Sequence, residues 1–314
     1  MVAAHARGDL LQLRTSGTSG GVRSVLRTTD SWVRSFPAVS ALLELTASAQ
    51  LWVPGPLSTT MNLFSAVHAA FAGATLVDSP DRASHAVLTP ATLSRLVGDL
   101  RPGLHVLVAG DRLEPVLHDR ASAAGLRVSH YYGAAELSFV AWGAHAEDLR
   151  PFPGVEVVSR EGVLWVRSPY LCEGYVGPPG PLTTDSAGFA TVGDRGSHDD
   201  GRVRVTGRGT EAVTTGGATV LVADVEAALR PSTEGELAIV GIPHPDLGAV
   251  LGCVLTSPSC FQAVREAARA LPPEHRPRRW FHLARLPVTH AGKLDRPALQ
   301  DILVSSTEGV RRLA

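Results

Sequence analysis

The sequence predicts an α/β fold in which a large N-terminal domain with a mainly parallel sheet and a small β subdomain precedes a small α+β C-terminal domain. Between residues 50 and 131, short apolar stretches alternate with segments of helical periodicity, which indicates a parallel sheet covered on both faces. From residue 151, short apolar stretches are separated by Gly, Pro and Asp, which indicates antiparallel pairing.

The predicted elements support this division. The expected helices of the N-terminal domain span 32–45, 60–71, 90–100 and 113–124, and the expected strands span 50–53, 74–77, 86–88, 105–109 and 126–131. Strands are expected at 155–158, 163–166, 189–192 and 203–205 in a β-rich subdomain that covers about 151–207. After the candidate hinge at Gly207-Arg208-Gly209, helices are expected at 223–229, 260–270 and 296–303, and strands at 236–240, 250–255 and 280–283. We therefore predict domains at 1–207 and 208–314.

Composition narrows the function classes. The chain of 314 residues is 44% hydrophobic and 19% charged with a formal net charge of −1, which argues against nucleic acid as the main partner. The most apolar stretch, 63–77, is interrupted by Ser65 and His68 and is too short to span a bilayer, so no membrane association is expected. The N-terminus lacks a signal peptide's apolar core, and three cysteines without metal-type spacing favour a reducing cytoplasm.

The lysine content is unusual. Of the 29 basic residues only Lys293 is a lysine, so the other 28 are arginines. Lysine is normally among the commonest residues, which draws attention to the position that retains it.

A loop rich in glycine and hydroxyl groups, Thr15–Ser24 (TSGTSGGVRS), follows a short apolar strand at 10–13 and is interpreted as leaving the edge of a sheet. Glycines let successive backbone N–H groups face one concavity, and hydroxyls and Arg23 add donors and positive charge, which suits a polyphosphate. The P-loop pattern GxxxxGK(S/T) fails, because Val22 and Arg23 stand where it needs Gly and Lys. A flexible Ser/Gly linker is the alternative. The loops at 15–24, 110–113 and 131–136 all follow predicted strands, so we expect them to share one cleft.

Four further stretches carry candidate chemistry: SHYYGAAE at 129–136, TVGDRG at 191–196, GR at 207–208 and PVTHAGKLDR at 287–296. Each is weak evidence alone, because a carboxylate after a glycine is usually solvated and an Asp in a turn usually caps its own backbone.

Together and in this order, the motifs TSGTSG, YYGAAE, TVGDRG, GRGTEAVTTGG and GKLDR resemble the adenylate-forming superfamily of acyl-CoA synthetases and non-ribosomal adenylation domains. The resemblance covers about residues 10–303. The compact form and the stretch TTGGATVLVADVEAAL are most similar to o-succinylbenzoate-CoA ligases of menaquinone biosynthesis.

The resemblance implies a reaction with two steps. A small carboxylic acid and MgATP give an acyl-adenylate, and the acyl group then passes to the thiol of CoA or of a carrier protein's phosphopantetheine. Negative charge must be neutralised at the α-phosphate and at the leaving pyrophosphate.

The resemblance also assigns roles to residues. Thr15, Ser16, Gly17, Thr18, Ser19 and Gly20 would wrap the phosphates with help from Arg23, and Gly110, Asp111, Gly133 and Ala134 would complete the nucleotide site. Tyr132 would pack on adenine, Asp194 would bind the ribose hydroxyls with Arg208 nearby, and Glu136 would hold Mg²⁺. Lys293 would bridge the acyl carboxylate and the α-phosphate, and it would leave when the mobile C-terminal domain rotates and brings Gly216 and Gly217 to the thiol path.

Departures from the family pattern leave alternatives open. Ala135 replaces a usual Thr, Thr210 replaces a usual acidic hinge residue, and only 14 residues precede the phosphate loop. The acyl pocket is therefore open or completed by a partner subunit, and a homodimer is among the expectations. The stretch 54–67 has no Arg or Lys for a second carboxylate, so an apolar or hydroxylated monoacid fits better than succinylbenzoate. A carrier-protein-loading enzyme, an o-succinylbenzoate-CoA ligase and a non-catalytic nucleotide-binding relative remain the alternatives to an acyl-CoA ligase.

Overall fold

The computed structural model describes residues 5, 7–15, 23–208, 212–215, 217–305 and 309–313, and within these the side chains of Thr15 and Arg208 are not described. Contacts divide the chain into two units, Met1–Val205 with His290–Lys293, and Thr206–Thr289 with Leu294–Ala314. The division falls beside the candidate hinge. It groups Lys293 with the first unit, whereas the sequence-based division placed this residue on the C-terminal domain.

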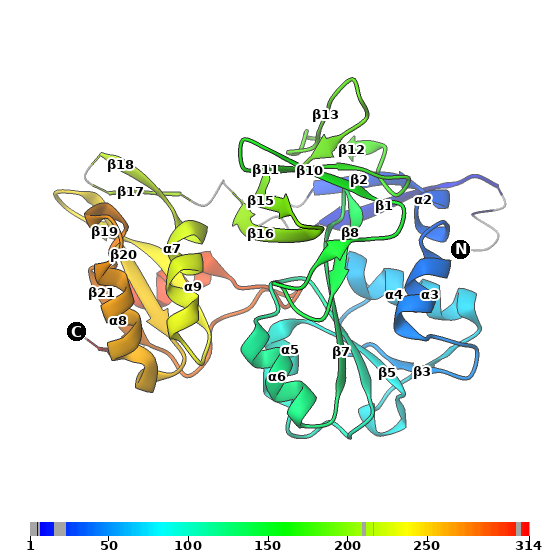
Figure 1. Ribbon diagram of the computed structural model, residues 1–314, viewed down its shortest axis with the longest axis horizontal. Helices are drawn as coiled ribbons and strands as arrows, with labels where there is room; N and C mark the ends of the chain where they lie inside the picture. Colours follow the sequence, from blue (N-terminus) through cyan, green and yellow to red (C-terminus); the bar gives the residue numbers. More distant parts are fainter. Residues whose placement is uncertain are drawn as a thin grey trace. The chain divides into compact units, whose positions relative to one another are not determined.

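The first unit is built on a seven-stranded sheet with the order β4-β3-β5-β6-β7-β8-β9 (Figure 1). The strands are β3 (Gln50–Trp52), β4 (Thr75–Val77), β5 (His85–Leu88), β6 (His105–Val108), β7 (Arg127–Ala134), β8 (Ser138–Gly143) and β9 (Arg150–Pro151). Strands β3 to β7 pair in parallel, and β8 and β9 add antiparallel pairs at one edge. The predicted mainly parallel sheet is confirmed.

Both faces of this sheet are covered, as the continuous apolar strands require. The helices are α2 (Asp30–Val33), α3 (Phe36–Leu43), α4 (Thr60–Ala72), α5 (Pro90–Leu96) and α6 (Pro115–Ala123). Val87 and Leu107 pack in one core with side chains of α2 to α4, whereas Leu88 and Val106 pack in a second core with side chains of α5 and α6. Successive side chains along β5 and β6 thus point to opposite faces of the sheet and pack against two different layers of helices.

Two antiparallel sheets complete the first unit. One has the order β1-β2-β12, from β1 (Leu10–Thr15), β2 (Arg23–Thr28) and β12 (Gly174–Val176). The other has the order β13-β14-β11-β15-β16 with β10 beside β11, and its last strand crosses into the second unit. Its strands are β10 (Glu156–Arg160), β11 (Val163–Arg167), β13 (Thr183–Thr184), β14 (Ala190–Thr191), β15 (Asp194–Asp199) and β16 (Arg202–Arg208).

The second unit is an α+β body around a sheet with the order β18-β17-β20-β21-β22, with β19 beside β20. Its elements are β17 (Ala212–Thr215), β18 (Ala218–Leu221), α7 (Val222–Leu229), β19 (Leu237–His244), β20 (Gly248–Leu255), α8 (Phe261–Arg269), β21 (Arg279–His282), α9 (Arg296–Val304) and β22 (Arg311–Arg312). One core joins the sheet to α7 and α8, and another joins it to α9. Single 3-10 turns lie at η1 (Pro80–Arg82), η2 (Arg230–Ser232), η3 (Pro258–Cys260) and η4 (Pro273–His275).

Two local predictions are wrong. The helix expected at 32–45 is two helices, α2 and α3, because Pro37 has no N–H to donate toward Val33 and its ring would clash with that carbonyl. The strand expected to end at Tyr131 continues to Ala134, because it pairs with β8. The strand expected before the glycine-rich loop is present as β1, at the edge of a separate antiparallel sheet in which it pairs with β2.

Within the described part of the chain, no helix is long and apolar enough to cross a membrane.

Candidate functional site

The predicted site residues fall on elements of different kinds. Ser16–Gly20 and Gly216 lie outside the described residues. So does Thr210, which stands where the family pattern has an acidic hinge residue. Thr15 ends β1 and Arg23 begins β2, opposite each other in the hairpin register. These two backbone positions bracket the predicted phosphate loop.

Tyr132 and Asp194 are brought together by the fold. Tyr132 lies on β7 and Asp194 begins β15, 62 residues later, yet the tyrosine hydroxyl donates a 2.6 Å hydrogen bond to Asp194 Oδ2. Asp194 is buried. A hydrogen bond to a carboxylate is stronger than one between neutral groups, so it fixes the aromatic ring and the carboxylate in one orientation.

The backbone at Gly133 explains how this end of β7 is shaped. The β7–β8 register shifts between Tyr132 and Gly133, which marks a bulge. A Cβ at Gly133 would collide with the carbonyl oxygen of Ser138. Only glycine therefore allows β8 to approach this closely at the bulge.

Glu136, the predicted magnesium ligand, is buried and has a partner that the sequence did not reveal. Its Oε1 accepts a 2.9 Å hydrogen bond from the hydroxyl of Tyr175 on β12. Burial raises the pKa of Tyr175, and the Glu136 carboxylate raises it further. No signal in the sequence links these two residues, because they are 39 positions apart.

Beneath Glu136 lies a fully buried arginine that sequence reasoning also missed. Arg27 on β2 donates from Nη2 to the carbonyl oxygens of Ala135, at 2.8 Å, and Glu136, at 3.5 Å, and from Nη1 to Ser31 Oγ. Burial lowers the pKa of Arg27 to about 10. The guanidinium therefore holds the backbone on which the Glu136 carboxylate is carried.

One carboxylate is a sufficient protein contribution for magnesium. Mg²⁺ in phosphate-transfer sites typically binds one or two carboxylates together with substrate phosphates and water. Among the described residues, no group of three or more His, Cys, Asp or Glu side chains is arranged to hold a metal. A magnesium ion bound together with substrate phosphates would therefore need no carboxylate beyond Glu136.

The residues before Lys293 lie against the ends of the parallel strands. Gly292 has φ +74°, and a Cβ there would lie 2.8 Å from Cγ2 of Thr89, the residue that follows β5. A Cβ at Gly110, which follows β6, would lie 3.6 Å from the same Thr89 methyl group. His290 Nε2 is also 3.3 Å from Ser58 Oγ. The fold thus brings the segment ahead of Lys293 to the edge where ligands of such sheets bind.

A small cavity of about 80 Å³ lies at this place. It is lined by Pro54, Gly55, Pro56, Met61, Asn62, Val87, Leu88, Thr89, Thr92, His290, Ala291 and Gly292. The lining includes part of the stretch 54–67 that was predicted to bind the acyl group, and it includes no Arg or Lys.

The remaining predicted residues are placed as follows. Asp111 is exposed, and its Oδ1 accepts a 2.7 Å hydrogen bond from the backbone N–H of Arg112. Arg208 ends β16 and Gly217 lies between β17 and β18, and both belong to the second unit.

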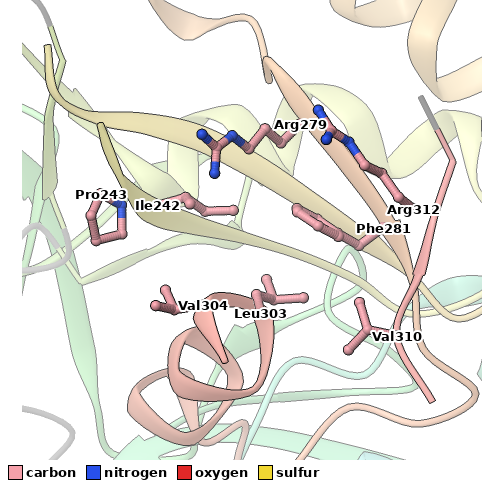
Figure 2. Close-up of a pocket in the computed structure, with 8 residues that line it drawn as sticks. All are labelled: Ile242, Pro243, Arg279, Phe281, Leu303, Val304, Val310 and Arg312. Carbon is pink, nitrogen blue, oxygen red and sulfur yellow. The ribbon is translucent and has the colours of Figure 1, made fainter. Parts of the chain in front are cut away.

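The second unit has a hollow of its own, of about 310 Å³, shown in Figure 2. Arg279, Phe281 and Arg312 line it from strands on one side, and Leu303 and Val304 line it from α9 on the other. None of the predicted site residues in the described part of the chain lines this hollow, so it is not included in the candidate site.

The fold of the chain is shared with solved structures of other proteins. ATP-bound MatB from Rhodopseudomonas palustris has the same fold: the TM-score is 0.77 at 22% identity, and the match covers 94% of this chain and 68% of that one. No protein-family model matches the chain.

Curated relatives define the similarity further. The acyl–CoA ligase YhfT of Bacillus subtilis, described as uncharacterized, is 24% identical over 336 residues, which cover 94% of this chain and 68% of YhfT. A probable 2-succinylbenzoate–CoA ligase of Mycobacterium tuberculosis is 34% identical over 206 residues, which cover 62% of this chain and 52% of that protein. The chain is thus homologous to acyl–CoA ligases, which confirms the resemblance recognised in its motifs, and it spans between about half and two thirds of these relatives.

Proposed function

We propose that the chain is an ATP-dependent acid–thiol ligase that activates a small carboxylic acid as an acyl-adenylate and transfers the acyl group to CoA. Homology to acyl–CoA ligases supports the class of reaction. The observation that carries the assignment to this chain is the packing of Gly292 against Thr89, because it puts the segment ahead of the single lysine at the ligand-binding edge of the sheet.

In the proposed reaction, Lys293 neutralises charge where the acid attacks the α-phosphate. An ammonium on a flexible stem suits this moving contact better than a planar guanidinium, which gives a reason for a lysine in a chain with 28 arginines. Tyr132 and Asp194 bind the adenosine part of ATP through the ring face and the carboxylate. Their hydrogen bond orients both groups before the nucleotide arrives.

Glu136 is proposed to bind the magnesium ion that accompanies ATP. The ion supplies neutralisation of the phosphate charges. Tyr175 and Arg27 orient the Glu136 carboxylate and its backbone, so that its position does not depend on the ion. The hydroxyls and glycines of Thr15–Gly20 together with Arg23 are proposed to hold the outer phosphates, and Gly110, Asp111, Gly133, Ala134 and Arg208 to complete the nucleotide site.

The acyl acceptor and the second half-reaction are also proposals. CoA is favoured because the homologues are CoA ligases, and a carrier-protein phosphopantetheine is the alternative. Gly216 and Gly217 are proposed to line the thiol path after rotation of the C-terminal domain. The three cysteines are free thiols, which agrees with a reducing cytoplasmic location.

Two classes of carboxylic acid are candidates for the substrate. The relative from M. tuberculosis favours 2-succinylbenzoate. The absence of Arg and Lys among the residues that line the small cavity favours an apolar or hydroxylated monoacid, because a second carboxylate would have no cation there.

The test is pyrophosphate release with MgATP across a panel of acids that includes 2-succinylbenzoate, with and without CoA. We expect one class of acid to give AMP and pyrophosphate, and CoA to convert the product to a thioester. Lys293→Ala should lower pyrophosphate exchange roughly 10²–10³-fold, the scale for removal of one charge-stabilising donor. ATP binding without product from any acid would instead favour a non-catalytic nucleotide-binding relative, and an unchanged exchange rate in the variant would refute the role of Lys293.

A further inference from the structure

The second unit contains a buried carboxylate with an unusually complete set of donors. Glu226 on α7 is 2% exposed. Its Oε1 accepts hydrogen bonds of 2.8 Å from Arg296 Nη1 and 2.8 Å from the backbone N–H of Ile239. Its Oε2 accepts hydrogen bonds of 3.0 Å from Arg296 Nη2 and 3.3 Å from Arg230 Nη2. The carboxylate is therefore fixed from three directions.

Arg296 is the group that this carboxylate holds in place. The pairing with Glu226 is bidentate, and Arg296 Nη1 also donates a 2.9 Å hydrogen bond to the carbonyl oxygen of Ile239 on β19. A planar guanidinium held at both nitrogens by a buried carboxylate has one orientation. Because Arg296 is the first residue of α9, the start of this helix is locked to α7 and β19.

The loop that carries Lys293 ends at this locked point. The backbone N–H of Asp295 donates a 2.9 Å hydrogen bond to the carbonyl oxygen of Pro287, and Val288 and Leu294 form an antiparallel bridge. The Asp295 carboxylate caps α9 by accepting from the N–H of Ala298 at 3.0 Å. Lys293 is thus the last residue of a loop whose stem, formed by 287–288 and 294–295, is closed immediately before Arg296.

A purely stabilising role is a poor explanation for this pair. Replacing a buried ion pair by well-packed apolar residues is often neutral or stabilising, because removing two charges from water is costly. What an ion pair of this geometry provides is a defined orientation of the chain at Arg296. The residue that would benefit from such an orientation lies three positions earlier, at Lys293.

We propose that Glu226, acting through Arg296, is a positioning residue for Lys293. The pair fixes the stem of the loop, so that the ammonium group occupies a narrow range of positions when the acyl-adenylate forms. The kinetic part of this inference rests on the proposed function, whereas the structural part does not.

The structural test uses the only lysine of the sequence as a reporter. Reductive methylation of the full chain with ¹³C-formaldehyde places a dimethyl label on Lys293 and on the N-terminal amine, and a Lys293→Arg sample, which carries only the N-terminal label, identifies the Lys293 resonance. Glu226→Gln preserves the shape of the side chain and removes its charge, and Arg296→Gln removes the bidentate fork without adding a second lysine to the chain. Glu266→Gln is the matched control, because Glu266 forms an exposed ion pair with Arg269 on α8.

We expect both Glu226→Gln and Arg296→Gln to shift or broaden the Lys293 methyl resonance, and Glu266→Gln to leave it unchanged. Thermal unfolding is measured on the same samples. A lower unfolding temperature with an unchanged Lys293 resonance in both variants would show that the pair is structural only, and it would overturn the proposal. Arg296→Gln keeps the test available if Glu226→Gln does not fold.

The kinetic test compares the two half-reactions with the acid that the panel identifies. Misplacement of a catalytic group by about 1 Å can cost on the order of 10²-fold, so we expect Glu226→Gln to slow acyl-adenylate formation roughly 10- to 10²-fold. Thioester formation from a preformed acyl-adenylate should change less than about twofold, because Lys293 is not used in that step. Equal losses in both steps would overturn the positioning role. If the wild-type chain forms no adenylate with any acid, the proposed function fails, while the methyl resonance still tests the coupling of Glu226 to Lys293.

Discussion

Histidines buried in the first unit should make its stability depend strongly on pH. Burial lowers the pKa of His130 on β7 from 6.5 to about 4, and its Nδ1 lies 2.9 Å from the carbonyl oxygen of Val108 on β6. Burial likewise lowers the pKa of His68 and of His105 to about 4. His68 packs against the ring of Phe36, with 5.1 Å between the ring centroids. These imidazoles are therefore neutral in the folded chain at pH 7.

The sign of the effect follows from proton binding. Between pH 6.5 and about 4 the unfolded chain binds a proton at each of these histidines while the folded chain does not. Stability is therefore complete above pH 6.5 and is lost as the pH falls through this window. Between pH 6.5 and pH 5 the interval is about 1.5 pH units, which at about 1.4 kcal/mol per unit gives roughly 2 kcal/mol for each histidine.

The assay is urea unfolding at pH 7.5 and at pH 5, with His130→Gln compared with the wild-type chain at each pH. Glutamine can keep a donor near the Val108 carbonyl oxygen but does not titrate. The difference in unfolding free energy between the two pH values should be about 2 kcal/mol smaller in His130→Gln. Comparing variants at equal pH cancels the contributions of all other groups. The control is Val116→Gln at an exposed position of α6, which removes no titrating group and should leave the difference unchanged. An equal pH difference in His130→Gln and the wild-type chain would refute the reasoning.

Three further predictions concern the site and the core. Tyr132→Phe removes the hydroxyl that binds Asp194, and it should raise the KM for ATP about tenfold in the pyrophosphate assay, the equivalent of one charge-assisted hydrogen bond. Gly133→Ala forces a Cβ against the Ser138 carbonyl oxygen, and it should lower the unfolding free energy by roughly 1–3 kcal/mol in urea, with Gly98→Ala, where a Cβ meets no atom within 4 Å, as the control. Phe64→Ala leaves a cavity among aromatic rings that include Phe139 at 4.9 Å, and it should cost about 3–5 kcal/mol by the same measurement.

The parts of the fold that the sequence predicts well are those determined by neighbouring residues. Helix α4 was expected at 60–71 and spans Thr60–Ala72. Thr59 caps its first turn by accepting a hydrogen bond from the N–H of Asn62, and Gly73 ends it in the left-handed conformation. Signals at both ends and an apolar face are all contained in one short stretch, so the element can be recognised without knowledge of the tertiary fold.

The elements that were missed depend on partners elsewhere in the chain. Strand β8 was not predicted, and it forms the antiparallel pair that extends β7 past Tyr131. Strand β22 has two residues and exists because it pairs with β21. Such pairing comes from register and not from local periodicity, so a short edge strand has too few residues to be recognised.

The candidate site shows the same limit at the level of single residues. Motifs identified Tyr132, Asp194 and Glu136 individually, and their order along the chain indicated that they act together. They did not indicate that Tyr132 would donate to Asp194 or that Tyr175 would donate to Glu136. Local sequence identifies the groups that carry chemistry, whereas the groups that orient them are supplied by strands that become neighbours only in the folded chain.

The residues on either side of Lys293 distinguish it from an ordinary surface lysine. A lysine in a loop is an ordinary surface feature, and its rarity in this sequence is only a hint. Two independent constraints make the position specific: Gly292 approaches Thr89 at the end of β5 so closely that a Cβ there would lie 2.8 Å from its methyl group, and the stem after Lys293 is closed by Leu294 and Asp295. A loop constrained on both sides of its one charged residue loses little further entropy when that residue engages a substrate, which is the condition under which a single ammonium group contributes most to a reaction.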